Sequence, residues 1–167
     1  LFAGGSGAPA ILDSACHASK GKLFWVVPDL TLVKAYSYLL KDVRIPTEIF
    51  VTRESGEESQ FKMMDTFFDS VFSDDTDSSE EREKLSAQDV EKSEKTLSSD
   101  HTLVTVYYQR PDIKQIVSNE IVNSSETSVG IVGCGPSPMM DTLRNVVATS
   151  AFSTEKAINF YDELQVW

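Results

Sequence analysis

The chain has 167 residues, enough for one domain with a hydrophobic core, and its content of 41% hydrophobic and 25% charged residues is ordinary for a soluble protein. A formal net charge of −11 argues against a nucleic-acid or anionic-membrane surface, because phosphate groups are bound by basic faces. The two cysteines, Cys16 and Cys134, form neither a disulfide framework nor a metal-ligand spacing, which favours a reducing compartment.

Strand-like and helix-like segments alternate along the chain. Apolar runs bounded by turn residues predict buried strands, and apolar positions three and four residues apart predict helices with one buried face. The predicted strands are a strand end within 1–5, then 22–28, 47–53, 101–109, 127–134 and 157–167. The predicted helices are 8–19, 30–42, 61–72, 112–122 (with Pro111 at its start) and 137–151. This alternation predicts a parallel sheet with helices on both faces.

Residues 73–100 interrupt this pattern. Ten of these 28 residues are acidic, four are basic, nine are Ser or Thr, and only four are apolar. So few apolar side chains cannot offset the entropy lost on ordering the segment. We therefore expect a flexible, exposed acidic insertion, partly helical around 79–95; a phosphorylated regulatory loop is the alternative.

The first candidate site is the turn Gly5-Ser6-Gly7, which with Ala10 fits the pattern G-x-G-x-x-G/A between a strand and a helix. The glycines let the backbone approach a pyrophosphate, and the helix N-terminus supplies amide donors. The alternative is an ordinary tight turn.

Thr52 and Arg53 follow a predicted strand, at the edge where open parallel sheets bind ligands. A hydroxyl and a guanidinium there could together hold the 2′-phosphate of NADP, since Arg forms paired hydrogen bonds to phosphate. The alternative is an Arg53 that pairs with a nearby glutamate, Glu54, Glu57 or Glu58.

Gly133-Cys134-Gly135-Pro136 also lies between a strand and a helix. A nucleophilic thiol would need a base, and no motif places His17 or His101 near it. Cys134 is therefore expected to be either a core residue or a small, polarisable wall beside a flat ring. The terminal Trp167 is frayed, packed, or a stacking lid.

The order of these motifs is more specific than any one of them. The "GGSG" turn, "VTRE", "QRPDI", "GCGPSPMMD" and a terminal "FYDELQVW" resemble the NAD(P)-binding half of the ferredoxin-NADP reductase superfamily, and within it the fungal ferric-chelate reductases. The resemblance covers nearly the whole chain except about 54–100. It implies an α/β fold: a three-layer Rossmann-like nucleotide-binding domain with an open, mainly parallel sheet and helices on both faces.

The resemblance also implies site residues. Two are catalytic by implication: Cys134, near the reactive nicotinamide carbon, and Trp167, which covers the flavin ring until nicotinamide displaces it. The implied cofactor-binding residues are Gly5, Ser6, Gly7, Thr52, Arg53, Arg110, Pro111, Gly133, Gly135, Pro136 and Met139. No metal ligand is implied. The chain departs from the family at one position: many relatives carry an Arg after the second strand, but this chain has Pro28-Asp29 there. Arg53 is therefore expected to be the main residue that recognises the 2′-phosphate.

The family's larger architecture is implied as well. Residues 1–167 would be the C-terminal NAD(P)H-binding part, soluble as a fragment, of a flavohaem reductase whose FAD-binding and transmembrane haem domains precede Leu1. The whole protein would pass electrons from NADPH through FAD and haem to extracellular ferric or cupric ions, with this domain on the cytoplasmic face of the plasma membrane. The alternatives are the same domain of a superoxide-producing NADPH oxidase and a non-catalytic nucleotide-sensing or interaction domain.

Overall fold

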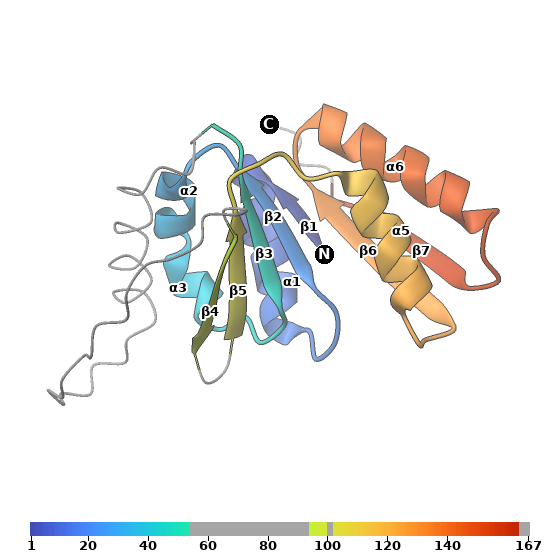
Figure 1. Cartoon of the computed structure of the whole chain (residues 1–167), viewed down its shortest axis with the longest axis horizontal. Helices are drawn as coiled ribbons and strands as arrows, with labels where there is room; N and C mark the ends of the chain where they lie inside the picture. The colour runs from blue at the N-terminus through green and yellow to red at the C-terminus, as the bar shows by residue number, and fades with distance from the viewer. Residues whose placement is uncertain (54–93, 100–101, 164–167) are drawn as a thin grey trace, which may run out of the picture.

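The computed structural model describes residues 1–53, 94–99 and 102–163. Within these ranges one sheet of seven strands has the order β4-β5-β3-β2-β1-β6-β7 (Figure 1). All neighbouring pairs are parallel except the edge pair of β4 and β5, which is antiparallel. The strands are β1 (Phe2–Gly4), β2 (Leu23–Val27), β3 (Thr47–Val51), β4 (Glu94–Ser99), β5 (Thr102–Tyr107), β6 (Ser128–Cys134) and β7 (Ala157–Asp162).

Helices cover both faces of this sheet. They are the 3-10 helix η1 (Gly5–Gly7), α1 (Ala8–His17), α2 (Leu30–Ala35), α3 (Ser37–Leu40), α5 (Ile113–Asn123) and α6 (Ser137–Ala151). Neighbouring residues of β2 show how the two layers form. Trp25 belongs to the core cluster shared with α1, α2 and α3, whereas Phe24 belongs to the cluster shared with α5 and α6. The predicted three-layer α/β fold with a mainly parallel sheet is confirmed.

One predicted helix is divided in two. The segment 30–42 was expected to be continuous, but α2 ends and α3 begins on either side of Tyr36, whose φ of −108° and ψ of 16° are not helical. The Tyr36 ring lies beside the buried Trp25, with ring centroids 6.3 Å apart. The break therefore coincides with a contact to the sheet, and such a tertiary contact can override helical periodicity.

The acidic insertion is also shorter than predicted. Residues 94–99, expected to be exposed and in part helical, form the edge strand β4, with Glu94 opposite Tyr107 and Ser99 opposite Thr102. Pairing at a sheet edge uses backbone hydrogen bonds, so the scarcity of apolar side chains did not prevent it. Residues 54–93, which include the predicted helix 61–72, lie outside the described residues.

Candidate functional site

The site lies where the strand order changes direction. β1 pairs with β2 on one side and with β6 on the other, so Ala3 stands opposite Cys134. After β1 the chain continues into α1 on one face of the sheet, and after β6 it continues into α6 on the other. Diverging connections of this kind open a crevice at the carboxyl ends of the strands, where open α/β sheets bind ligands.

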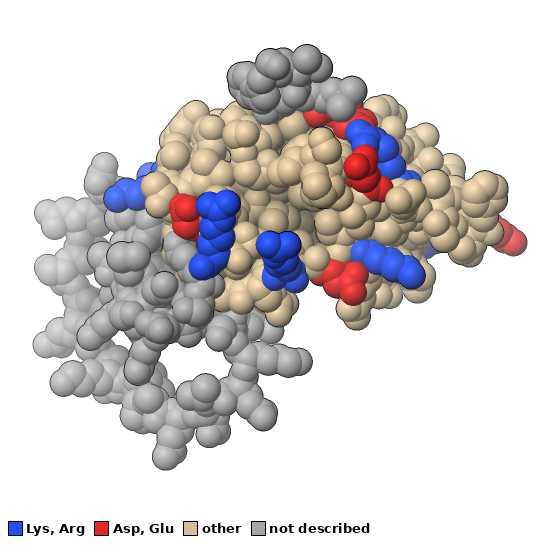
Figure 2. Space-filling model, turned by 90° about the horizontal axis from the view of Figure 1, so that it is seen from above, with Lys and Arg blue, Asp and Glu red and all other residues tan. Residues whose placement is uncertain are grey.

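A groove of about 610 Å³ occupies this position. It contains seven of the residues predicted from the sequence: Gly5, Thr52, Arg53, Arg110, Pro111, Pro136 and Met139. The remaining lining residues are Gly4, Val26, Val27, Pro28, Ile113, Pro138 and Thr142. Figure 2 views the molecule from above, from the side where α6 begins in Figure 1, and shows several Lys and Arg side chains around the centre of this face.

The two glycine-containing turns beside the groove are locked together. A Cβ placed on Gly7 would lie 2.7 Å from the backbone oxygen of Cys134, and one on Gly4 would lie 2.7 Å from Cδ of Pro136. A Cβ on Gly135 would lie 3.0 Å from Cα of Gly4, a backbone atom at the end of β1. Glycine is therefore needed at these positions because the end of β1 and the end of β6 approach each other too closely for a side chain.

The first turn leaves few backbone amides for a ligand. Gly5 has a φ of +53°, a conformation open to glycine, and α1 begins at Ala8 as predicted. The amide of Ala8 donates to the Gly5 oxygen, and Pro9 has no N–H to offer. The candidate amide donors to an anion therefore lie within η1, where Ser6 is exposed.

Arg53 is held at the mouth of the groove by its backbone. The amides of Thr52 and Arg53 donate to the carbonyl oxygens of Val27 and Pro28, at 2.9 and 3.0 Å, so the chain continues beside β2 after β3 ends. The Thr52 hydroxyl also donates to the Val27 oxygen, at 3.2 Å. Its proton is thus committed to the backbone, which leaves the guanidinium of Arg53 as the donor at this position.

Arg53 and Arg110 are both exposed and line the groove from different elements. Among the residues that the structure describes, no carboxylate forms an ion pair with either of them. Arg110 precedes α5, which begins at Ile113 with Asp112 as its N-cap, so Pro111 lies before the cap rather than at the helix start predicted for it. Glu54, Glu57 and Glu58, the predicted alternative partners of Arg53, lie outside the described residues. Two guanidinium groups in one groove, with no carboxylate partner in the described part of the chain, favour an anionic ligand.

Cys134 does not line the groove. Only 1% of the residue is exposed, and its Sγ would lie 2.8 Å from a Cβ on Gly7. Burial raises the pKa of the thiol, and the charges of Glu163 and Asp162 raise it further. Ser6, Gly7, Gly133 and Gly135 belong to the two turns rather than to the lining, and Trp167 lies outside the described residues.

Sequence patterns did not indicate every residue of the site. Val26, Val27 and Pro28 form part of the wall because β2 ends there, and the boundaries predicted for that strand would have located them. Thr142 also lines the groove, because it lies in the second turn of α6, next to the helix start that forms part of the wall. It carries no motif.

The fold and the groove define a Rossmann-like α/β domain with a candidate ligand site at its topological switch point. The model of the family "Ferric reductase NAD binding domain" matches residues 1–148. The chain belongs to this family, as the sequence motifs indicated, and is the NAD-binding domain of a ferric-reductase-type oxidoreductase with a nicotinamide nucleotide as its cofactor. A comparison with curated proteins finds no match. Across 1–53, 94–99 and 102–163, no helix combines the length and the apolar character required to cross a membrane.

Proposed function

We propose that this domain binds NADPH in the groove and presents the nicotinamide for hydride transfer to FAD, within a membrane reductase that passes the electrons through haem to extracellular ferric or cupric chelates. The observation that carries the nucleotide part is the meeting of Arg53, Arg110 and the Gly5 turn in one groove at the switch point. When bound, the nicotinamide supplies the hydride, and the protein supplies position and electrostatics.

In this proposal each part of the groove has its own task. The amides of η1 bind the pyrophosphate, and Arg53, with Arg110 beside it, binds the 2′-phosphate. Pro136 and Met139 form an apolar wall toward the nicotinamide end. Cys134 supports this wall from behind through the Gly7 contact, and Trp167 would cover the flavin until nicotinamide displaces it.

Three features favour NADPH over NADH. No Asp or Glu lines the described part of the groove, so nothing there matches the carboxylate that binds a free ribose 2′-hydroxyl in NAD-selective sites. Asp29 follows β2, where such a carboxylate would stand, but its Oδ1 accepts the Thr31 amide at 3.0 Å as the N-cap of α2. Arg53 and Arg110, which have no carboxylate partner among the described residues, supply the opposite charge.

The direct test is calorimetric titration of the chain with NADP⁺ and, separately, with NAD⁺. Saturable binding of NADP⁺ at least tenfold tighter than that of NAD⁺ is expected, because a charge-assisted phosphate contact contributes about 1.5–3 kcal/mol. Equal affinities would contradict the role of the arginines. If neither nucleotide binds, the titration is repeated with a chain extended N-terminally through the flavin domain, and failure there would overturn the proposal.

A further inference from the structure

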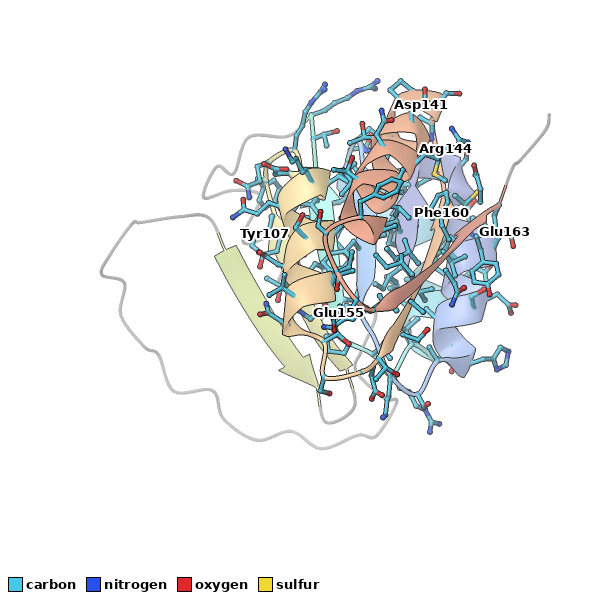
Figure 3. The ribbon with its side chains drawn as sticks, turned by 90° about the vertical axis from the view of Figure 1, so that its right-hand side faces the viewer. Tyr107, Asp141, Arg144, Glu155, Phe160 and Glu163 are labelled. Atoms are coloured by element: carbon cyan, nitrogen blue, oxygen red, sulfur yellow. The ribbon has the colours of Figure 1, made fainter. Side chains whose placement is uncertain are left out.

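Arg144 connects two elements that flank the Gly133–Pro136 turn. Its Nε donates to Oδ2 of Asp162 at 2.8 Å and its Nη2 donates to the same oxygen, while its Nη1 donates to Oδ1 of Asp141 at 2.6 Å. Figure 3 shows Arg144 and Asp141 on α6 and Glu163 at the end of β7. The guanidinium therefore joins α6, which follows the turn, to β7, which pairs with the strand before it.

The far side of this bridge is fastened to the turn itself. Asp162 is the last residue of β7 and stands opposite Gly133. The next amide, that of Glu163, donates to the Gly133 oxygen at 2.9 Å. The chain thus forms a closed circuit from Gly133 through the turn and α6 to Arg144, and back through Asp162 and Glu163.

Asp162 depends on Arg144 for compensation of its charge. Its side chain is 21% exposed, and its second oxygen, Oδ1, is buried with no hydrogen-bond partner among the described residues. Removing the guanidinium would leave a largely buried carboxylate with no counter-charge from the part of the chain that the structure describes. That is a costly state, which a shift of the end of β7 toward solvent would relieve.

We propose that Arg144 is a positioning residue for the nicotinamide end of the site. It fixes the Gly133–Pro136 turn against β7, and so fixes the start of α6, where Pro136 and Met139 line the groove. The inference rests on the proposed function, since it assigns the nicotinamide to this end. Arg53 and Arg110, at the phosphate end, follow β3 and β5 and are not part of the circuit.

This division of the groove provides the test. Dissociation constants of NADP⁺ and of adenosine 2′,5′-bisphosphate, which lacks the nicotinamide half, are measured for the wild-type chain and for Arg144→Ala. About tenfold weaker NADP⁺ binding is expected, in the range of couplings within one hydrogen-bonded network, with the bisphosphate constant changed less than twofold. Arg144→Lys keeps the charge but cannot form the paired bonds, so its NADP⁺ dissociation constant should lie between those of the wild-type chain and Arg144→Ala.

The matched control is Lys22→Ala, which removes the ion pair between Lys22 Nζ and Glu120 Oε1, 2.6 Å apart. The two side chains are 40% and 37% exposed, and the pair lies at the opposite end of the sheet from the groove. It should change neither constant. If Arg144→Ala weakens both ligands equally, or leaves NADP⁺ binding unchanged, Arg144 is not a positioning residue. If Arg144→Ala does not fold, Arg144→Lys decides by the same two constants. Failure of the wild-type chain, also when extended through the flavin domain, to bind either ligand would overturn the proposed function instead.

Discussion

Arg53 is the residue on which the choice between the two nicotinamide nucleotides is expected to depend. It is exposed, has no acidic partner among the described residues, and lies at the groove mouth. Arg53→Ala should weaken NADP⁺ binding by roughly ten- to a hundredfold, because a charge-assisted hydrogen bond contributes about 1.5–3 kcal/mol, and should change NAD⁺ binding less than twofold. Calorimetry at low salt measures both, since salt screens exposed charges.

Arg44 offers the matched control for Arg53. It is also exposed, but it precedes β3 and so lies near the amino end of that strand, whereas the groove lies at the carboxyl ends. Arg44→Ala should leave both affinities unchanged. An equal loss of NADP⁺ and NAD⁺ affinity in Arg53→Ala would show that the residue contacts a part common to the two nucleotides.

The thiol of Cys134 is expected to react slowly with thiol reagents in the folded chain. Burial raises its pKa above the usual value of 9.0, so the reactive thiolate forms only at still higher pH. In a Cys16→Ser background, reaction with a thiol reagent at pH 8 should be at least about tenfold slower in the native chain than in urea. Because the folded state disfavours the thiolate, the stability associated with the protonated thiol should decrease as the pH rises above 9.0. Equal reaction rates in buffer and urea would instead place the thiol at the surface of the groove.

At the scale of elements, the contact between the two turns is the feature that builds the site. Gly7→Ala would bring a Cβ within 2.7 Å of a backbone atom that cannot rotate away, the Cys134 oxygen. We expect a loss of about 1–3 kcal/mol in the free energy of unfolding, as for overpacking in a core. Urea denaturation measures it.

Gly130 provides the comparison, because a Cβ there would meet nothing within 4 Å. Gly130→Ala in β6 should be neutral or slightly stabilising, since alanine restricts the unfolded chain. A Gly7→Ala chain as stable as the wild type would mean that the turns can move apart, and that their close approach does not hold the groove in shape.

The elements also show what sequence could predict. The helix at 137–151 was predicted to the residue, because Pro138 marks its start and its apolar residues recur on one face. The break at Tyr36 was not predicted, because it lies at a contact with Trp25, a residue of a strand, and the helical periodicity of 30–42 carries no sign of that contact. β4 was missed because edge pairing leaves no pattern in side chains.

The same limit applies within the site. Residues at strand ends and glycine turns follow from local spacing, and seven of those predicted meet in one groove. The Arg144–Asp162 pair joins a helix to a strand, and nothing in the local pattern of either segment signals the other. The burial of Cys134 likewise depends on Gly7, which is distant in sequence.

At the scale of the whole molecule, the charge of the chain opposes the ligand that the groove is expected to bind. The net charge is −11, of which residues 73–100 carry −6, from ten acidic and four basic residues. We therefore expect an anionic nucleotide to be repelled at long range, and under the proposed function its binding would come from local contacts with Arg53, Arg110 and η1. These short-range contacts should favour selectivity over fast association.

Nucleotide binding should consequently raise the free energy of unfolding, and with it the Tm, of the entire domain. A ligand that binds only the folded chain at a hundred times its dissociation constant adds about 2.7 kcal/mol to the free energy of unfolding. For a domain of this size that corresponds to a rise in Tm of roughly 5–11 °C. Differential scanning calorimetry with NADP⁺ should show this rise, and the same concentration of NAD⁺ should produce a much smaller one. Because Arg53 is exposed, Arg53→Ala is expected to keep the ligand-free Tm and to reduce the NADP⁺ shift to that of NAD⁺. A full NADP⁺ shift in this variant would show that the 2′-phosphate is bound elsewhere.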